Sequence, residues 1–455
     1  MKTASVRIIA GVDPTGYAGI VADRRTLTHL GLVTDLISDP TAIKIGMIEN
    51  PDEVKIFLSN NSCKIVLDPL FFSSTGSPLF KTNVEQHTHY LKSLLPLVDI
   101  ITPNCHEAEI LLNRSITSYH DLENAAQSLI ELGARNVLLK GGHFKDSVFS
   151  QDYWTNGHES FWLANTRFQE KNYRGTGCMM SSAIAGCLAL GFTIKDAVVI
   201  GKMIVHRGIR LSKSLDPHTA ELFYGSWPEE QVDLPYLSPT PLTEPPKRFQ
   251  PCSMGLYPVV DRYRWLEILL PLGVKHIQLR IKDLKGIALD HDIQKSIQLA
   301  KDYGALLFIN DYWEQALRFK AEGIHLGQSD IESADINRIR EAGVSLGIST
   351  HCYYEVARAH TCRPSYMACG PIYPTTSKIM PFQPQGISQL NRLRRTLQYP
   401  LVAIGGINHE RLPDILESGV EGVAVISAIT QSEDPIVSTK VFLKMINESR
   451  YVQSL

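Results

Sequence analysis

The sequence has 455 residues, which exceeds one ordinary domain and predicts two or three, each able to bury a core. Hydrophobic residues make up 44% and charged residues 20%, which is typical of a soluble globular protein. The 45 basic residues nearly balance 47 acidic ones, which argues against a nucleic-acid-binding groove.

No apolar run reaches the roughly 20 residues that cross a bilayer, and the amino-terminal segment lacks the apolar stretch of a signal peptide. Eight cysteines are scattered without a C-x-x-C pair, and Cys63, Cys187 and Cys369 have apolar neighbours. We therefore expect a cytoplasmic protein with free thiols, without disulfides, a zinc site or a membrane partner.

The first half alternates strand-like and helical segments. An apolar run at residues 4–12 leads into a Gly-rich turn at 13–19 and a predicted helix that ends near Gly31. Further strand-like runs are 42–46, 64–70, 99–104 and 136–142. This alternation predicts a doubly wound α/β sheet that binds its ligands at the carboxyl ends of the strands.

Residues 174–178, Arg-Gly-Thr-Gly-Cys, precede a long apolar helical segment. Small residues before a helix leave backbone N–H groups free to hold the negative charge of a phosphoryl group. Cys178 would stand at the positive end of that helix, where a thiol pKa is lowered. A Gly-rich helix start with a merely packed cysteine is the open alternative.

Residues 7–195 resemble the hydroxymethylpyrimidine/phosphomethylpyrimidine kinases of the ribokinase-like superfamily, through the motifs AGVDPTGYAGIVADRRTLTHLG, AIKIGMI, IVLDPL, ITPNCHEAEILL, VLLKGGH and RGTGCMMSSAIA. The resemblance implies ATP as a co-substrate. It also implies these roles: pyrimidine binding by Asp23, Mg-ATP binding by Asn104 and Glu107, phosphate contact by Lys140, an anion hole at Gly175 and Gly177, and catalysis by Cys178.

This half also departs from that family. Only ten residues separate Gly31 from Ala42, where the family carries further strands that cover the active site and a glutamine that contacts the pyrimidine. Tyr17 replaces a glycine in the turn. Because the missing cover would exclude water, we predict an impaired kinase.

Residues 226–253 contain a cluster of prolines and show no helical or strand period. Such a segment predicts a stiff, extended spacer. We therefore predict a kinase-like domain at residues 1–230, a proline-rich linker at 231–253 and a second domain at 254–455.

The second half contains eight strand-like runs, most separated by helix-length segments. These runs are 256–260, 276–281, 305–311, 323–327, 344–350, 366–372, 401–407 and 422–429. Eight strand-helix units in about two hundred residues predict a (β/α)8 TIM barrel with its active site at the carboxyl ends of the strands.

Polar residues gather where these strands end. Asp311 and Asp330 each follow a strand, so they emerge on one rim and could share Mg²⁺; helix N-capping is the alternative. Gln278, Arg280 and Lys282 alternate along one face. Two sites where backbone N–H groups commonly bind phosphate are Gly405-Gly406 and Ile426-Ser427.

Residues 255–445 resemble thiamine phosphate synthase through QLRIKD, FINDYWEQAL, GIHLGQSD, LGIST, CGPIYPTTSK, VAIGGI and VAVISAI. The resemblance implies that hydroxymethylpyrimidine diphosphate and thiazole phosphate condense with release of pyrophosphate. It assigns Mg²⁺ to Asp311 and Asp330, catalysis to Arg280, Lys282 and Lys378, and substrate binding to Gln278, Arg280, Lys282, Asn310, Ser349, Thr375, Thr376, Ser377, Lys378, Gly406, Ile426 and Ser427.

Three hypotheses stay open at this point. The chain is a bifunctional enzyme, a synthase whose shortened first half only binds or scaffolds, or an unrelated phosphate-binding barrel such as a sugar-phosphate isomerase. Small-molecule substrates, including hydroxymethylpyrimidine and its phosphates, are the expected partners, and a homo-oligomer is one open possibility.

Overall fold

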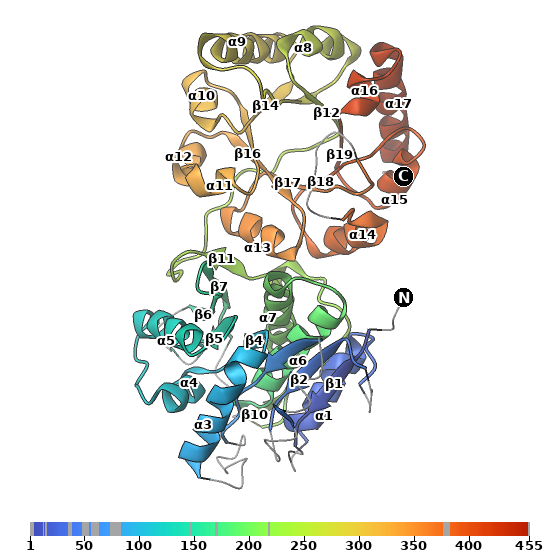
Figure 1. Ribbon diagram of the computed structural model, residues 1–455. Helices are drawn as coiled ribbons and strands as arrows, with labels where there is room; N and C mark the ends of the chain where they lie inside the picture. Colours follow the sequence, from blue (N-terminus) through green and yellow to red (C-terminus); the bar gives the residue numbers. More distant parts are fainter. Residues whose placement is uncertain are drawn as a thin grey trace. The chain divides into compact units, whose positions relative to one another are not determined.

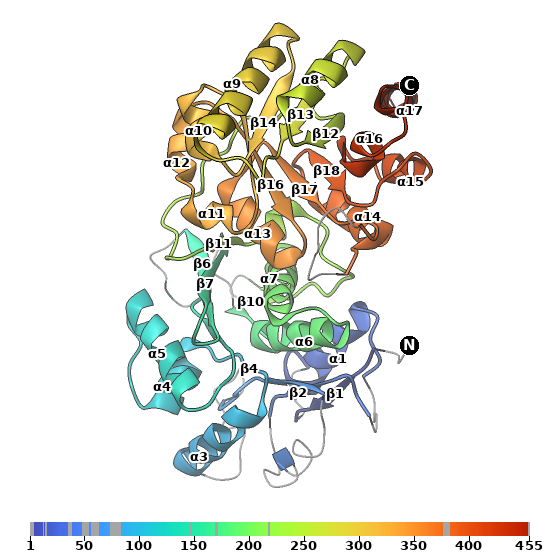
Figure 2. The same ribbon diagram turned by 45° about the horizontal axis from the view of Figure 1, so that its top comes forward.

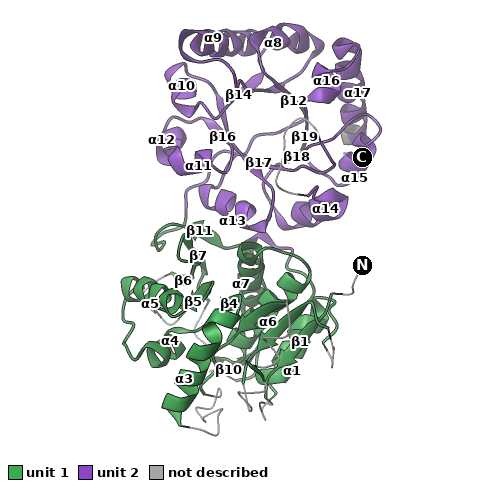
Figure 3. Cartoon of the chain, viewed as in Figure 1, with its two compact units in different colours: residues 1–228, 232–245 green, residues 229–231, 246–455 purple. Residues whose placement is uncertain are grey.

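The computed structural model describes residues 4–11, 13, 16–34, 39–47, 54–55, 63–72, 83–142, 144, 148–168, 172–216, 219–375 and 383–453. The chain forms two compact units (Figure 3). Unit 1 comprises residues 1–228 and 232–245, and unit 2 comprises residues 229–231 and 246–455. Within the described ranges, no helix is long and apolar enough to cross a membrane.

Unit 1 is built on an eight-stranded sheet (Figure 1). In spatial order its strands are β1 (Val6–Ile9), β2 (Ala42–Ile45), β3 (Lys64–Leu67), β4 (Ile100–Ile101), β5 (Val137–Lys140), β6 (Phe149–Thr155), β7 (Ser160–Thr166) and β11 (Tyr236–Ser238). The first five are parallel, and β6, β7 and β11 pair antiparallel. The smaller sheet contains β8 (Asn172–Tyr173), β10 (Thr219–Glu221) and β9 (Lys213–Ser214).

Helices cover both faces of this sheet because its strands are apolar on both sides. The helices of unit 1 are α1 (Gly19–His29), α3 (Val84–Leu94), η1 (Leu95–Leu97), α4 (Cys105–Leu112), α5 (Tyr119–Glu131), α6 (Thr176–Ala189) and α7 (Ile194–Arg210). Ile43, Leu67 and Leu139 belong to a core cluster that includes buried residues of α3, α4 and α5. Helices α1 and α6 pack together, and α6 contacts β2 and β3 (Figure 2).

The segments that follow β1 in the chain lie on opposite sides of it, first Val33 and then β2. The backbone N–H of Val6 donates to the carbonyl oxygen of Val33 at 3.0 Å, and Ser5 and Val33 form a parallel bridge. On its other edge, β1 pairs with β2. The turn after β1 therefore lies at the switch point of a doubly wound sheet, where such folds bind ligands. This agrees with the predicted fold class.

The predicted linker at 231–253 is wrong. A 3-10 helix, η2 (Gln231–Asp233), and strand β11 lie within it, and β11 pairs with β7. The side-chain amide of Gln151 also exchanges two hydrogen bonds with the backbone of Leu242, at 2.8 and 3.0 Å. Downstream, the Phe249 N–H donates to the carbonyl of Arg363 in unit 2. Prolines suited to an edge strand and a 3-10 turn were thus mistaken for a free spacer.

Unit 2 is a closed parallel barrel, as predicted (Figure 1). Its strands are β12 (Leu256–Val260), β13 (His276–Leu279), β14 (Leu306–Asn310), β15 (Gly323–Leu326), β16 (Ser345–Thr350), β17 (Tyr366–Cys369), β18 (Leu401–Ile404) and β19 (Gly422–Val425). Strand β19 pairs with β12 and closes the sheet.

Helices follow these strands in the alternation expected of a (β/α)8 fold. They are α8 (Tyr263–Leu269), η3 (Leu270–Leu272), α9 (Gly286–Asp302), α10 (Trp313–Arg318), α11 (Asp330–Ser333), α12 (Ile336–Glu341), α13 (Tyr353–Cys362), α14 (Gly386–Thr396), α15 (Leu412–Glu417), α16 (Ser427–Thr430) and α17 (Pro435–Gln453). Inside the barrel, the rings of Tyr257, Phe308 and Tyr366 meet edge to face with centroids 5.1–5.8 Å apart. These rings belong to the core cluster inside the barrel.

Candidate active sites

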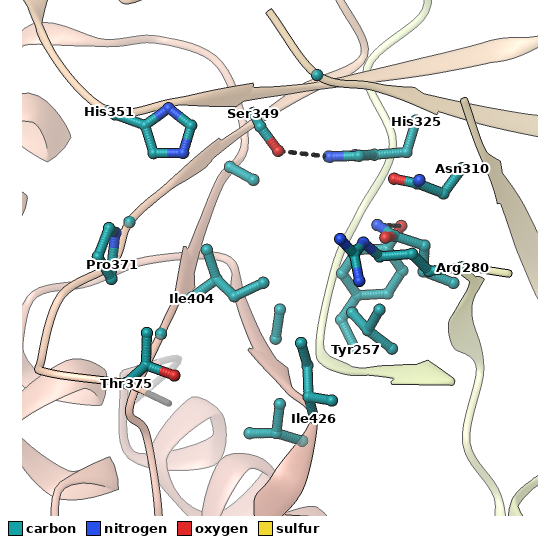
Figure 4. Close-up of a pocket in the computed structure, with 18 of the residues that line it drawn as sticks. Tyr257, Arg280, Asn310, His325, Ser349, His351, Pro371, Thr375, Ile404 and Ile426 are labelled. Carbon is teal, nitrogen blue, oxygen red and sulfur yellow. Dashed lines mark hydrogen bonds between the residues drawn. The ribbon is translucent and has the colours of Figure 1, made fainter. Parts of the chain in front are cut away.

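A cavity of about 490 Å³ opens at the carboxyl ends of the barrel strands. Its lining brings together residues that the sequence predicted from separate strands: Gln278, Arg280, Lys282, Asn310, Asp311, Asp330, Ser349, Thr375, Gly406, Ile426 and Ser427. Figure 4 shows several of these side chains around the cavity. Thr376, Ser377 and Lys378 lie outside the described residues. The ligand roles of all these residues remain predictions.

Two carboxylates stand close together on this rim. Asp311 directly follows β14 in a left-handed conformation (φ 64°) and forms an ion pair with Lys282. Burial raises the pKa of Asp330, and the negative charge of Asp311 raises it further. Neither residue is a helix N-cap, because Tyr312 and Ser329 hold those positions. The capping alternative is therefore wrong.

This acid pair fits a divalent cation. Two like charges that raise a carboxyl pKa are stabilised by a metal between them, and carboxylate oxygens are ligands that Mg²⁺ prefers. Across the described ranges, no group of three or more His, Cys, Asp or Glu side chains could hold a metal ion. Asp311 and Asp330 therefore suit an ion that takes its other ligands from a substrate and water.

The glycine turn after β18 forms another wall of the cavity. Gly405 and Gly406 have φ values of +100° and +66°. A Cβ on Gly406 would stand 2.5 Å from the carbonyl oxygen of Pro374, and the Tyr373 N–H donates to the carbonyl of Gly405 at 3.0 Å. Only glycine fits this close approach, which seats the loop after β17 against the turn.

A chain of buried polar groups that was not predicted from the sequence reaches the cavity. The hydroxyl oxygens of Tyr257 and Tyr366 lie 2.7 Å apart, Tyr366 Oη is 2.7 Å from His325 Nδ1, and His325 Nε2 is 2.8 Å from Ser349 Oγ. Burial lowers the pKa of His325 to about 4, so its ring is neutral at neutral pH. Strand alternation could have shown that His325 points inward, but its partners Ser349 and Tyr366 lie on two other strands, β16 and β17.

His351 and Glu355 form a second pair on the lining that the sequence analysis did not use. One carboxylate oxygen of Glu355 accepts from the backbone N–H of His351 at 2.7 Å and lies 2.6 Å from its Nδ1. This arrangement fixes the orientation of the ring. The i, i+4 spacing at the start of α13 was the available signal.

Unit 1 gathers charged groups between the sheet and α6. Lys140 Nζ lies 3.4 Å from Asp68 and 3.9 Å from Glu107, and a Cβ on Gly177 would stand 3.1 Å from that same nitrogen. Lys140 therefore lies over the first turn of α6, next to the predicted anion hole. Burial raises the pKa of Glu107 to about 7, against the opposing effect of Lys140.

Asp23 lies in a fully buried ion pair. Its carboxylate accepts from Lys44 Nζ at 2.9 Å and from Ser182 Oγ at 2.7 Å, and both ionic side chains are 0% exposed. Burial opposes charge on Lys44, but the carboxylates around it raise its pKa above the ordinary value. Both oxygens of the Asp23 carboxylate therefore already have partners within the protein. The pyrimidine contact of Asp23 stays a prediction.

The surroundings of Cys178 do not favour the predicted thiolate. Cys178 lies in the first turn of α6, as expected, but it is only 4% exposed. Burial raises the pKa of its thiol to about 12, and this effect exceeds the opposing charge of Lys44. The helix terminus alone does not set the pKa, because desolvation outweighs it.

The other predicted residues of unit 1 hold local roles in the structure. Asn104 and Glu107 form a reciprocal capping box at the start of α4, with hydrogen bonds of 2.9 and 2.7 Å. Gly175 has φ 83°, and a Cβ there would collide with the carbonyl oxygen of Tyr17. The departure at Tyr17 thus lies directly against the Gly175 turn.

Comparisons with known proteins cover both units. A family described as thiamine monophosphate synthase matches residues 256–429, and one described as phosphomethylpyrimidine kinase matches residues 33–221. A thiamine-phosphate synthase of Enterobacter sp. is 50% identical over 196 residues, which is 43% of this chain and 93% of the relative.

Similar solved structures exist for each unit. A thiamine phosphate pyrophosphorylase from Pyrococcus furiosus is 28% identical, with 43% of this chain and 96% of that chain covered and a TM-score of 0.39. A phosphomethylpyrimidine kinase from Clostridium difficile is 28% identical, with 46% and 100% covered and a TM-score of 0.38.

Proposed function

The chain belongs to the thiamine-phosphate synthase family through unit 2 and carries a phosphomethylpyrimidine kinase domain in unit 1, and from this premise we propose the reaction of each unit. The barrel joins hydroxymethylpyrimidine diphosphate to thiazole phosphate. The observation that carries this proposal is a single cavity with an acid pair beside Lys282 and a separate glycine turn at Gly405-Gly406. One cavity thereby suits two anionic substrates.

The reaction breaks the bond between the pyrimidine methylene carbon and the diphosphate oxygen. The electron pair of that bond leaves with pyrophosphate, and the thiazole nitrogen supplies the pair for the new C–N bond, so the product carries a thiazolium charge. No side chain needs to act as a nucleophile. The aminopyrimidine ring stabilises the developing positive charge on the methylene carbon.

The residues of the cavity then have distinct tasks. Arg280 and Lys282 stabilise the negative charge of the departing diphosphate, while Gln278 and Asn310 orient the pyrimidine. Asp311 and Asp330 would hold Mg²⁺, which would supply positive charge to stabilise the leaving group. Backbone groups at Gly406, Ile426 and Ser427 bind the thiazole phosphate together with Thr375, Thr376 and Ser377, and Lys378 reaches the pyrophosphate.

An assay of the full chain with the two preformed substrates tests this proposal. We expect thiamine phosphate and pyrophosphate in equal amounts, loss of turnover with EDTA and recovery with Mg²⁺. An isomerase acting through a general base would turn over a sugar phosphate without Mg²⁺. Absence of thiamine phosphate under saturating substrates and Mg²⁺ would refute the synthase assignment.

For unit 1 we infer phosphorylation of hydroxymethylpyrimidine or its phosphate by ATP, at a low rate. Lys140 above the first turn of α6 supports a phosphate site there. The occupied carboxylate of Asp23 and the short connection from Gly31 to Ala42 support a low rate, because the pyrimidine loses contacts and cover.

These last two observations also favour a second candidate, in which unit 1 is a binding or scaffolding module. ADP formation by the full chain with ATP and hydroxymethylpyrimidine, without thiazole phosphate, separates the two. The Lys140→Met variant is the background control. Turnover at an ordinary kinase rate of about 1–100 per second would contradict the predicted impairment. Turnover equal to that of Lys140→Met would establish that unit 1 is a binding or scaffolding module.

A further inference from the structure

Buried polar groups at the barrel cavity form one continuous chain. Gln278 Nε2 donates to Tyr257 Oη at 3.1 Å, and from there the chain passes through Tyr366 and His325 to Ser349. Figure 4 shows its last link, between His325 and Ser349, at the edge of the cavity. Strands β12, β13, β15, β16 and β17 each supply one member.

Tyr366, at the centre of this chain, is closely packed. Tyr366 is 0% exposed, and its ring fills the place where a side chain at Gly347 would stand. Tyr257 and His325 are 1% and 4% exposed. Tyr366 does not line the cavity, whereas the other four members of the chain do. The Tyr366 hydroxyl is therefore placed to act on a ligand only through other side chains.

Counting donors gives the chain a direction. The Tyr257 oxygen accepts from Gln278, so its own proton needs an acceptor, and Tyr366 Oη is the one at hand. Tyr366 then donates to His325 Nδ1. A neutral imidazole carries one N–H, so the proton stays on Nε2 and is donated to Ser349 Oγ.

In this arrangement each tyrosine hydroxyl proton and the imidazole proton has an acceptor within the chain, and the hydroxyl proton of Ser349 is left for the cavity. In the opposite direction, Gln278 and Tyr366 would both donate to the Tyr257 oxygen, and the buried hydroxyl proton of Tyr257 would have no acceptor in the chain. An unsatisfied buried hydroxyl costs about 1–3 kcal/mol, so the first direction is favoured.

We propose that Tyr366 and His325 are positioning residues of the synthase reaction, which aim the hydroxyl proton of Ser349 at the diphosphate bound in the cavity. The inference rests on the proposed function of the barrel. A donor fixed before the reaction stabilises charge that develops on the leaving group without reorienting at that moment. Ser349 touches the substrate, and Tyr366 and His325 act through it.

A double-mutant cycle tests this role in the full chain. Tyr366→Phe is expected to lower kcat/KM for the pyrimidine diphosphate by about tenfold, the effect of one hydrogen bond. In a Ser349→Ala background the same change should have no further effect, because the group that it orients is gone. A structural role of Tyr366 would give the same loss in both backgrounds, and that result would overturn the proposal.

The matched control is Tyr399→Phe. The Tyr399 hydroxyl lies 2.9 Å from Nδ1 of the buried His360 in the same unit, and neither residue lines the cavity. This variant removes the same kind of buried hydrogen bond and should leave kcat/KM unchanged. If Tyr366→Phe does not fold, Tyr257→Phe interrupts the chain one link earlier and should give the same pattern against Ser349→Ala.

The tautomer of His325 gives a second measurement that does not depend on turnover. Nitrogen NMR of the full chain labelled with ¹⁵N-histidine, with His325→Gln to assign the signal, should find the proton on Nε2. A proton on Nδ1 would overturn the direction of the chain. Failure of the synthase proposal itself would instead appear as an inactive wild-type protein, whatever the tautomer of His325.

Discussion

Replacing Asp311 by asparagine tests the centre of the synthase site. Asparagine has the shape of aspartate and tolerates the left-handed conformation of residue 311 (φ 64°), so the backbone should keep its course. The change removes one negative charge from a side chain that is 21% exposed and paired with Lys282. A unit charge about 4 Å from its partner contributes about 4 kcal/mol at the effective dielectric of such a site.

That energy corresponds to a loss of about a thousandfold in kcat/KM. The assay measures kcat/KM for hydroxymethylpyrimidine diphosphate over a range of Mg²⁺ concentrations, and the variant should need more Mg²⁺. The pKa of Asp330 should fall towards its ordinary value, because the charge of Asp311 helps to raise it.

The control for this prediction is Asp290→Asn. Asp290 forms a partly exposed ion pair with Arg318 at 3.2 Å and does not line the cavity, so kcat/KM should not change. Both variants should keep the wild-type melting temperature within a few degrees. Full turnover and an unaltered Mg²⁺ requirement in Asp311→Asn would refute the metal assignment.

Three further predictions concern other parts of the molecule. Gly406→Ala should raise the KM for thiazole phosphate by about tenfold and the KM for the pyrimidine substrate by less, because the new Cβ would stand 2.5 Å from the carbonyl oxygen of Pro374. Equal increases in both KM values would contradict this prediction. With a pKa of about 12, about one Cys178 thiol in ten thousand is ionised at pH 8. Peptide mass spectrometry should therefore find Cys178 unlabelled by iodoacetamide unless the protein is unfolded first. Rapid labelling of the folded protein would show an accessible thiolate. Asp233→Asn should destabilise unit 1 by about 3 kcal/mol in denaturant unfolding of the full chain, because the paired Arg210 guanidinium loses its buried carboxylate. An unchanged unfolding transition of unit 1 would show that β11 does not depend on this contact.

Much of the architecture followed from local patterns. The apolar runs of the second half coincide with the eight barrel strands because the strand period and the strand-helix alternation are written locally in the chain. The positions of Asp311 and Asp330 just past their strands were predictable for the same reason. Strand β11 was missed because three residues among prolines carry little strand pattern, and only pairing with β7 makes them a strand.

The site could be predicted as a set of residues but not as a set of contacts. Local sequence identified Gln278, Arg280 and Ser349 as strand-end side chains, and their common cavity followed from barrel closure. It gave no sign of the hydroxyl of Tyr366 between Tyr257 and His325. These three residues are brought together by register across three different strands, and no local spacing encodes that register.

The sequence by itself determined two α/β units, the rim on which the barrel chemistry lies and the acid pair that suits a cation. The tertiary structure alone decided that Cys178 is a buried neutral thiol, that Asp23 is held by Lys44, and that residues 232–245 complete the first unit. The physical reason is that hydrophobic period and turn chemistry act between neighbours in the chain. Burial, charge pairing and strand register depend on groups that only the fold brings within a few ångströms.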